Sequence, residues 1–116
     1  MTVSASDTVI LVSRNGMGSA DPELQQKLIN TYFQLLDENS ILPAAICFYA
    51  DGVKLVVTGS AVIETLRSLE QKGVRLILCR TCLNYFKLED MVQVGIVGGM
   101  TDIIEAQFKY QKIILL

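Results

Sequence analysis

Two patterns alternate along the chain: short, continuous apolar runs and longer segments in which apolar residues recur at helical spacing. The helical spacing covers Leu24–Leu36 and Val62–Leu69, and more briefly Ile104–Phe108. The short runs lack an alternation of period two, which is typical of parallel strands covered on both faces. These predicted strands are Val9–Val12, Ala44–Tyr49, Leu76–Leu78, Val92–Val97 and Ile113–Leu116.

Strands that alternate with helices predict a mainly parallel sheet joined by right-handed crossovers. The length of 116 residues suits one domain, so we expect a single domain over residues 1–116. We predict a three-layer α/β/α fold with about five strands. The apolar ending Ile113–Leu116 predicts that the last strand lies inside the sheet, because an apolar edge promotes aggregation.

Capping residues give the expected helix boundaries. Asp21-Pro22 is typical of a helix start, with an N-cap followed by proline in the first turn. Ser60 and Thr101 are candidate N-caps of the two later helices. Lys72-Gly73 indicates a helix end just before the third strand.

Composition excludes several classes of function. The formal net charge is −2 and no basic run occurs, so we expect no nucleic-acid partner. The chain has no histidine, which excludes Ser-His-Asp and Cys-His catalysis and any histidine-ligated metal within it. No P-loop motif occurs, and Gly16-x-Gly18 fails as a dinucleotide fingerprint because Asp21 stands at the third glycine position. We expect no organic cofactor and no metal.

The sequence predicts a cytoplasmic location. Met1–Asp7 has neither the positive start nor the apolar stretch of a signal peptide. The longest apolar run, Ala44–Ala50, is far below the roughly 18 residues that a membrane span needs, so no membrane association is expected. Cysteines in the cytoplasm are expected to be reduced thiols.

Candidate chemistry gathers where the parallel strands end, because ligands bind at the carboxyl edge of such a sheet. Four loops should meet there: Arg14–Gly18, Asp51–Lys54, Cys79–Cys82 and Gly98–Thr101. They bring two thiols, two guanidinium groups and one ammonium group together, which makes the edge electropositive. A lone lysine is more often solvated, and paired glycines often serve only the backbone of a loop. The candidate anion-binding residues are Asn15, Lys54, Arg80, Thr81 and Gly99.

The C-x-x-C pair of Cys79 and Cys82 follows a predicted strand and is expected to open a helix. With Cys79 as N-cap, the helix end and Arg80 would favour its thiolate, and Cys82 would lie one turn further on, within reach of a group carried by Cys79. The alternative is that both cysteines only fill space in the core. A four-ligand zinc site is disfavoured, because Cys47 lies on another strand, where we expect it to be inert core.

Three of these segments resemble the DsrE-like family, and most closely the DsrE-like domain at the C-terminal end of YedF-type sulfurtransferase-like proteins of selenium metabolism. They are Gly16–Leu24, Phe48–Leu55 and Cys79–Phe86, and the resemblance extends over essentially the whole chain. It implies a flavodoxin-like fold, self-association into trimers or hexamers (a dimer is the alternative), and a persulfide on a loop cysteine. It also implies a sulfur-donor or acceptor carrier such as a TusA-like protein.

Three functional hypotheses follow. In the first, the chain is a sulfur or selenium carrier or sulfurtransferase: Cys79 accepts a sulfane sulfur, Arg80 stabilises the anion, and Cys82 assists release. In the second, the pair is a thiol–disulfide redox module, although the tryptophan expected in a thioredoxin motif is missing. In the third, the chain is a non-enzymatic oligomeric binding protein with packing thiols.

Overall fold

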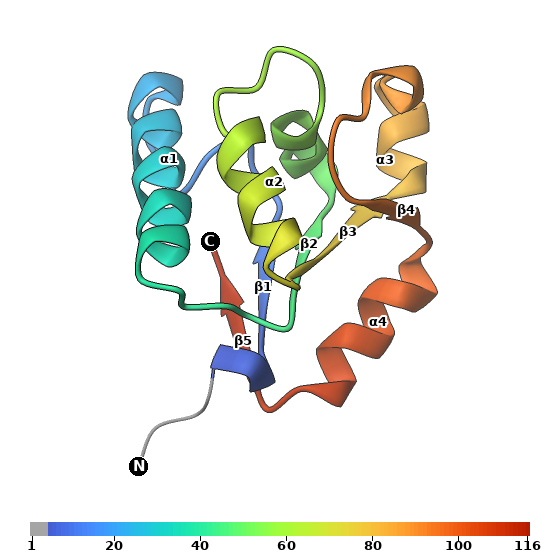
Figure 1. Cartoon of the computed structure of the whole chain (residues 1–116). Coiled ribbons are helices and arrows are strands. Elements are labelled where there is room, and N and C mark those ends of the chain that lie inside the picture. The colour runs from blue at the N-terminus through green and yellow to red at the C-terminus, as the bar shows by residue number, and fades with distance from the viewer. Residues whose placement is uncertain (1–4) are drawn as a thin grey trace.

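The computed structural model describes residues 5–116, so the first four residues of the Met1–Asp7 segment lie outside the described chain. It contains a five-stranded, all-parallel sheet in the order β4-β3-β2-β1-β5 (Figure 1). The expected sheet of about five parallel strands is therefore confirmed. The strands are β1 Thr8–Val12, β2 Ala45–Phe48, β3 Arg75–Cys79, β4 Ile96–Gly98 and β5 Lys112–Leu115.

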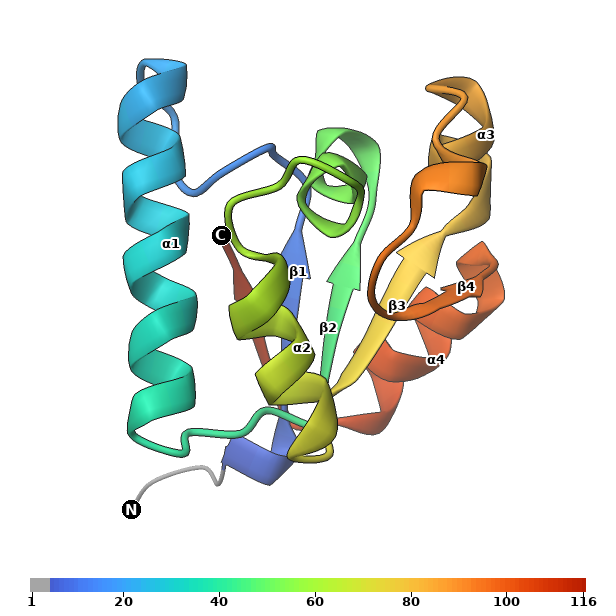
Figure 2. The same ribbon diagram turned by 45° about the horizontal axis from the view of Figure 1, so that its top comes forward.

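Helices cover both faces of the sheet, which gives three layers. Figure 2 shows α1 and α2 on one face and α4 on the other, while α3 continues from the upper end of β3. No helix within residues 5–116 is long and apolar enough to cross a membrane. The helices are α1 Pro22–Glu38, α2 Ile63–Gln71, α3 Arg80–Tyr85 and α4 Met100–Lys109, with the 3₁₀ segments η1 Ala5–Asp7, η2 Ala50–Val56 and η3 Glu89–Met91.

The central strand β2 and its neighbour β1 lie wholly within the core, because every residue of these two strands is buried. The prediction that the last strand lies inside the sheet is wrong. The β4–α4–β5 connection returns across the sheet and pairs β5 with the outer side of β1, so β5 is an edge strand. Ile113 and Leu115 of β5 are consequently exposed.

The predicted helix boundaries are confirmed at α1 and at the end of α2. Helix α1 begins at Pro22 after the N-cap Asp21, and α2 ends at the C-cap Lys72, followed by Gly73 with φ +102°. The predicted N-caps Ser60 and Thr101 are wrong by two residues. Val62 is the N-cap of α2 and donates its N–H to Ser60 Oγ over 3.3 Å. Thr101 lies inside α4, whose N-cap is Gly99.

Strand β4 begins later than the apolar run Val92–Val97 predicts. Val92 instead forms an isolated antiparallel bridge with Val57, in the segment that follows η2. Gly95 then adopts φ +90°, a conformation that favours glycine, and turns the chain into β4. The apolar residues of this segment therefore belong to two separate structures, the bridge at Val92 and the strand β4. Only β4 is part of the sheet.

Candidate functional site

A pair of thiols lies at the end of β3. Cys79 is the last residue of this strand and the N-cap of α3, and Cys82 lies within the first turn of that helix. The Cys82 thiol donates a hydrogen bond to Cys79 Sγ, with 3.1 Å between the two sulfur atoms. The prediction that the C-x-x-C motif links a strand to a helix is therefore confirmed.

The two sulfur positions differ in their access to solvent. Cys79 is 2% exposed and belongs to the hydrophobic core, whereas Cys82 is only partly buried. Our sequence-based hypothesis assigns the first attack to Cys79. The geometry instead makes Cys82 the sulfur that a reagent reaches first, with Cys79 in contact behind it. Cys47 is fully buried in the middle of β2, as expected.

A backbone amide completes the surroundings of Cys82. The N–H of Ala50, at the start of η2, donates to Cys82 Sγ over 3.1 Å. Ala50 has φ +50°, which costs a residue with a side chain about 1–2 kcal/mol. Non-glycine residues in such conformations are concentrated at functional sites. The sequence does not predict that this amide contacts Cys82, because alanine rarely adopts this backbone conformation.

Gly52 holds the η2 segment against the end of β1. A Cβ atom at this position would lie 2.1 Å from the carbonyl oxygen of Val12. This distance is too short for any side chain, so the position requires glycine. The same carbonyl accepts the N–H of Tyr49 over 3.1 Å, and Gly52 donates to the carbonyl of Tyr49 over 2.9 Å. This close approach fixes the path of the chain on either side of Ala50. The sequence Asp51-Gly52 does signal this turn.

The electrostatics of the pair favour a protonated Cys82. Burial raises the pKa of the Cys82 thiol, the hydrogen bond with Cys79 raises it further, and the Ala50 N–H opposes both effects. Burial raises the pKa of Cys47 to about 11, so that thiol is unreactive at neutral pH. The chemistry of the pair therefore requires a proton to leave Cys82 as it attacks.

Two of the predicted anion-binding residues, Lys54 and Gly99, lie in or next to segments that contact Cys79 or Cys82. Lys54 lies in η2: its ammonium lies 2.8 Å from Asp51 Oδ1 and 4.5 Å from the ring centre of Phe86, which follows Cys82 by four residues. Gly99 follows Gly98, the strand partner of Cys79, and donates its N–H to Asp102 Oδ2 over 2.8 Å.

The other predicted residues are less directly connected to the sulfur atoms. Arg80 and Thr81 are exposed on α3, a helix of only six residues, and Cys79 makes no side-chain capping hydrogen bond. Asn15 contacts α1, where its carbonyl and its Oδ1 accept the side-chain amide of Gln26 over 2.7 and 3.0 Å. The loop after β1 thus reaches the carboxyl edge but faces a different neighbour.

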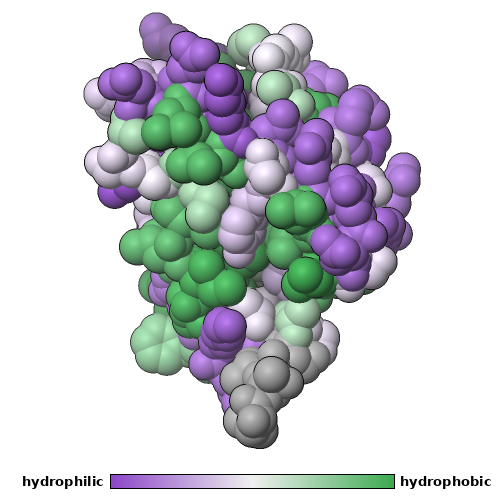
Figure 3. Space-filling view, turned by 90° about the vertical axis from the view of Figure 1, so that its left-hand side faces the viewer, coloured by the Kyte–Doolittle hydropathy of each residue, from purple (hydrophilic) through white to green (hydrophobic). Residues whose placement is uncertain are grey.

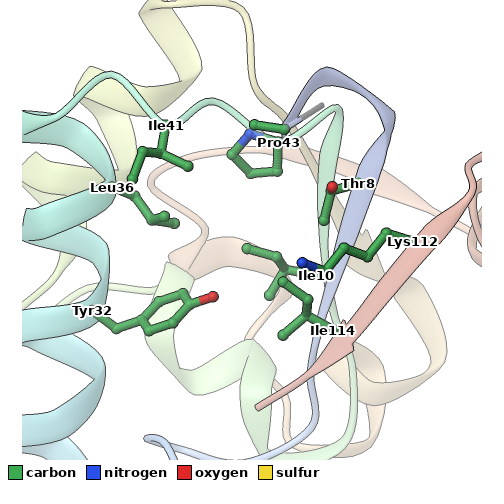
Figure 4. Close-up of a pocket in the computed structure, with 9 residues that line it drawn as sticks. Thr8, Ile10, Tyr32, Leu36, Ile41, Pro43, Lys112 and Ile114 are labelled. Atoms are coloured by element: carbon green, nitrogen blue, oxygen red, sulfur yellow. The ribbon is translucent and has the colours of Figure 1, made fainter. Parts of the chain in front are cut away.

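A separate cavity of about 150 Å³ lies at the opposite end of the sheet, between α1 and the strands β1 and β5 (Figure 4). Thr8 and Lys112, which begin these strands, line it together with apolar side chains. Tyr32 points its hydroxyl into this space, and burial raises the pKa of that phenol. The cavity contains no thiol, so it takes no part in the chemistry of Cys82.

No group of three or more Cys, Asp or Glu side chains within residues 5–116 is placed to hold a metal ion. At the carboxyl edge the structure brings together a partly exposed sulfur, a second sulfur in contact with it and one donor N–H.

Comparisons with known proteins agree with this fold. The model of the DsrE/DsrF-like family matches residues 8–116. No curated protein matches the sequence. Among solved structures, the YchN protein of E. coli is similar with a TM-score of 0.67 and 13% identity, over 94% of this chain and 98% of YchN.

Two proteins of unknown function have the same TM-score of 0.67. MTH1491 from Methanobacterium thermoautotrophicum is 18% identical over 94% of this chain and 97% of its own. BT1422 from Bacteroides thetaiotaomicron is 16% identical over the whole of both chains. At these identities the three structures establish the fold, a parallel α/β arrangement with helices on both faces.

Proposed function

The chain belongs to the DsrE/DsrF-like family, and we propose that it relays sulfane sulfur as a persulfide on Cys82. One observation carries this proposal: the partly exposed Cys82 sulfur lies 3.1 Å from both the Cys79 sulfur and the Ala50 N–H. The general association of the family with sulfur relay supports it. The presence of both cysteines supports placement in the YedF-like variety, in which selenium is a second possible cargo.

The loading step needs no oxidant. The Cys82 sulfur attacks the outer sulfur of a donor persulfide R–S–SH, a new S–S bond forms at Cys82, and the S–S bond of the donor breaks. The departing R–S⁻ takes up the proton that Cys82 loses, so the products are Cys82–S–SH and R–SH. The Ala50 N–H is placed to stabilise negative charge on the attacking sulfur, since hydrogen bonds to anionic groups are strong.

The sulfur leaves by a second transfer of the same kind. A thiolate of an acceptor, for which we propose a TusA-like carrier protein, attacks the outer sulfur and regenerates the Cys82 thiol. Cys79 provides another route, because its sulfur is in contact with Cys82: attack on Cys82 Sγ releases HS⁻ and leaves a Cys79–Cys82 disulfide. A cytoplasmic location, where thiol reductants reduce such a disulfide, suits this chemistry.

The short distance between the sulfur atoms also favours a second function, thiol–disulfide exchange. A disulfide needs an S–S bond of about 2.05 Å, and the two sulfur atoms are already in contact. In this case the dithiol would cycle with a redox buffer and would not retain a sulfane sulfur. A measured reduction potential separates the two functions, because a redox module must equilibrate readily with thiol reductants.

Self-association is a further part of the proposal. Ile114 of β5 lines the cavity on the α1 side, so Ile113 and Leu115 point to the opposite face, which also carries α4, packed against β3 and β4. Figure 3 shows apolar side chains gathered on the side of the molecule that carries α1 and β5. We propose that a second copy of the chain covers the α4–β5 apolar surface, which consists of the exposed residues Ile104, Phe108, Ile113 and Leu115.

Mass spectrometry tests the relay. After incubation with inorganic polysulfide, we expect the mass of one or more sulfur atoms on Cys82. Cys82→Ser should abolish the addition, whereas Cys47→Ser, which removes a fully buried thiol, should retain it. Cys79→Ser should retain loading and lose release as HS⁻. If the wild-type chain gains no sulfur, or if the addition persists in Cys82→Ser, the proposed carrier role of Cys82 is wrong.

A further inference from the structure

A polar groove lies against the η2 segment, whose first residue, Ala50, donates its N–H to Cys82 Sγ. It consists of two adjoining cavities of about 410 and 370 Å³, which share the side chains of Asn15, Gln26 and Lys54. Pockets of this size typically hold small organic ligands. The first cavity is also lined by Arg14 and Asp51, and the second by Ser60 and neighbouring residues. The polar groove thus joins the loop after β1 to the η2 segment.

The charges in the polar groove suit a carboxylate. Lys54 is paired with Asp51, and these two charges largely compensate each other. Arg14, in contrast, is exposed, and its guanidinium makes no hydrogen bond or ion pair with any residue in the range 5–116. A guanidinium group can bind a carboxylate through two parallel hydrogen bonds. The side chains of Asn15 and Gln26 lie next to it and are bonded to each other through Gln26 Nε2, so Asn15 Nδ2 and Gln26 Oε1 are the groups that can bind a peptide.

The wall of the polar groove is the same segment that touches the reactive sulfur. Asp51 lines the groove and directly follows Ala50, whose N–H donates to Cys82 Sγ. Lys54 lines both cavities, and its ammonium contacts the ring of Phe86 on α3. An extended tripeptide spans roughly 10 Å, which sets the reach of a donor bound in the groove.

Building on the persulfide relay, we infer that the polar groove binds the small-molecule sulfur donor, and that this donor is an anionic, tripeptide-sized thiol persulfide. Its carboxylate pairs with Arg14 and its peptide groups contact the amides of Asn15 and Gln26. Its outer sulfur is then transferred to Cys82, and the S–S bond of the donor breaks to release the peptide thiol. An inorganic sulfur anion would leave most of the groove empty.

Binding and transfer are measured separately. Glutathione, a tripeptide thiol without sulfane sulfur, is titrated into the wild-type chain by calorimetry. Loading of Cys82 is then compared between glutathione persulfide and inorganic polysulfide. Arg14→Gln should weaken glutathione binding at least tenfold and should lower the ratio of loading by glutathione persulfide to loading by polysulfide by a similar factor. Lys27→Gln makes the same change of charge on α1, outside the groove, and should alter neither quantity.

The results distinguish the groove from the relay itself. If glutathione does not bind, or if Arg14→Gln and Lys27→Gln behave alike, the groove is not the donor site, even when polysulfide loads Cys82. If a carrier-protein persulfide loads Cys82 while glutathione persulfide does not, the donor is a protein and this inference is wrong. If neither donor loads Cys82, the relay fails, and the assignment of a donor to the groove fails with it.

Discussion

At the scale of single residues, two properties of Cys82 bear on its proposed reactivity. Its side chain is partly exposed, which favours reaction, and the pKa of its thiol is raised, which opposes reaction at neutral pH. We predict that iodoacetamide labels Cys82 before Cys79 and Cys47 in the native protein, because only Cys82 is partly exposed. The thiolate is the reacting form, so the labelling rate should rise with pH and reach half its maximum above about 8.5, the ordinary value for cysteine. Peptide mass mapping over a pH series measures both quantities.

The variant Cys79→Ala is the control for the pH dependence of Cys82 labelling. It removes the hydrogen bond that raises the pKa of Cys82, so the midpoint of the labelling curve should move to lower pH. Cys47 is not among the groups that shift the pKa of Cys82, so Cys47→Ser should leave the midpoint unchanged. Labelling of Cys79 ahead of Cys82 would contradict the assignment of Cys82 as the accessible thiol.

The backbone of Ala50 gives a second prediction at this scale. Ala50→Gly relieves a positive φ that costs about 1–2 kcal/mol, and this gain exceeds the extra chain entropy that glycine loses on folding. The free energy of unfolding in urea should therefore rise by about 0.5–1 kcal/mol. The matched change Ala61→Gly, at an exposed position without positive φ, should lower it. A loss of stability in Ala50→Gly would show that this residue is not strained.

The positions of the candidate side chains could be predicted from the sequence, whereas the position of the backbone donor could not. Cys79 and Cys82 follow an apolar run, so the strand-end rule places them at the carboxyl edge. The position of the Ala50 N–H depends on an unfavourable backbone conformation, and alanine in the sequence does not indicate such a conformation. The burial of Cys79 depends on contacts with other segments, so spacing alone could not decide which sulfur is accessible.

At the scale of elements, α1 and α2 are joined by one charged contact. The Asp37 carboxylate accepts a hydrogen bond from Ser68 over 2.8 Å and pairs with the Lys72 ammonium at 2.9 Å. The hydrogen bond from Lys72 is the largest effect and holds the pKa of Asp37 below its usual value; burial opposes it, and the Ser68 hydrogen bond and the Lys72 charge lower the pKa further. These contacts connect the ends of two neighbouring helices on one face of the sheet.

Asp37→Asn should lower the free energy of unfolding by about 1 kcal/mol at neutral pH. The folded pKa of Asp37 is depressed, so its contribution is complete above the unfolded value of about 3.9 and is lost as the pH falls through the folded value. The difference between variant and wild type should therefore close in acid. Urea unfolding at neutral pH and near pH 3 measures this, with the exposed pair of Glu23 and Lys27 as control: Glu23→Gln should change stability by at most about 0.5 kcal/mol.

Elements with strong local signals were predicted well. Asp21-Pro22 and Lys72-Gly73 mark their helix ends correctly, because capping acts within a few residues. The run Val92–Val97 predicts a start of β4 that is too early, because the sequence does not distinguish apolar residues in an isolated bridge from apolar residues in a strand. The turn at Gly95 separates the two, and only the three-dimensional pairing of Val92 with Val57 reveals it.

At the scale of the whole molecule, local patterns predict parallel strands but not their order. The order β4-β3-β2-β1-β5 puts the strongly apolar β5 at an edge, where the sequence suggested an interior strand. An edge strand exposes unpaired backbone groups, and apolar side chains beside it make association with another chain favourable. The proposed self-association would account for the hydrophobicity of β5.

The α4–β5 apolar surface gives the prediction at this scale. Phe108 is 86% exposed, so its replacement costs the isolated chain little. If a second copy covers this surface, Phe108→Glu buries a charge at the interface and should convert the wild-type oligomer to monomers, as measured by sedimentation velocity. The expected association is a trimer or hexamer, and dissociation should leave the far-ultraviolet circular dichroism spectrum unchanged.

The other exposed apolar residues provide the matched control for this surface. Leu24, on the outer side of α1, is 47% exposed and lies outside the α4–β5 apolar surface. Leu24→Glu introduces the same charge and should leave the sedimentation coefficient unchanged. A wild-type chain that sediments as a monomer would contradict self-association altogether. If Leu24→Glu dissociates the oligomer and Phe108→Glu does not, copies of the chain associate through α1, and the exposed residues of β5 require another explanation.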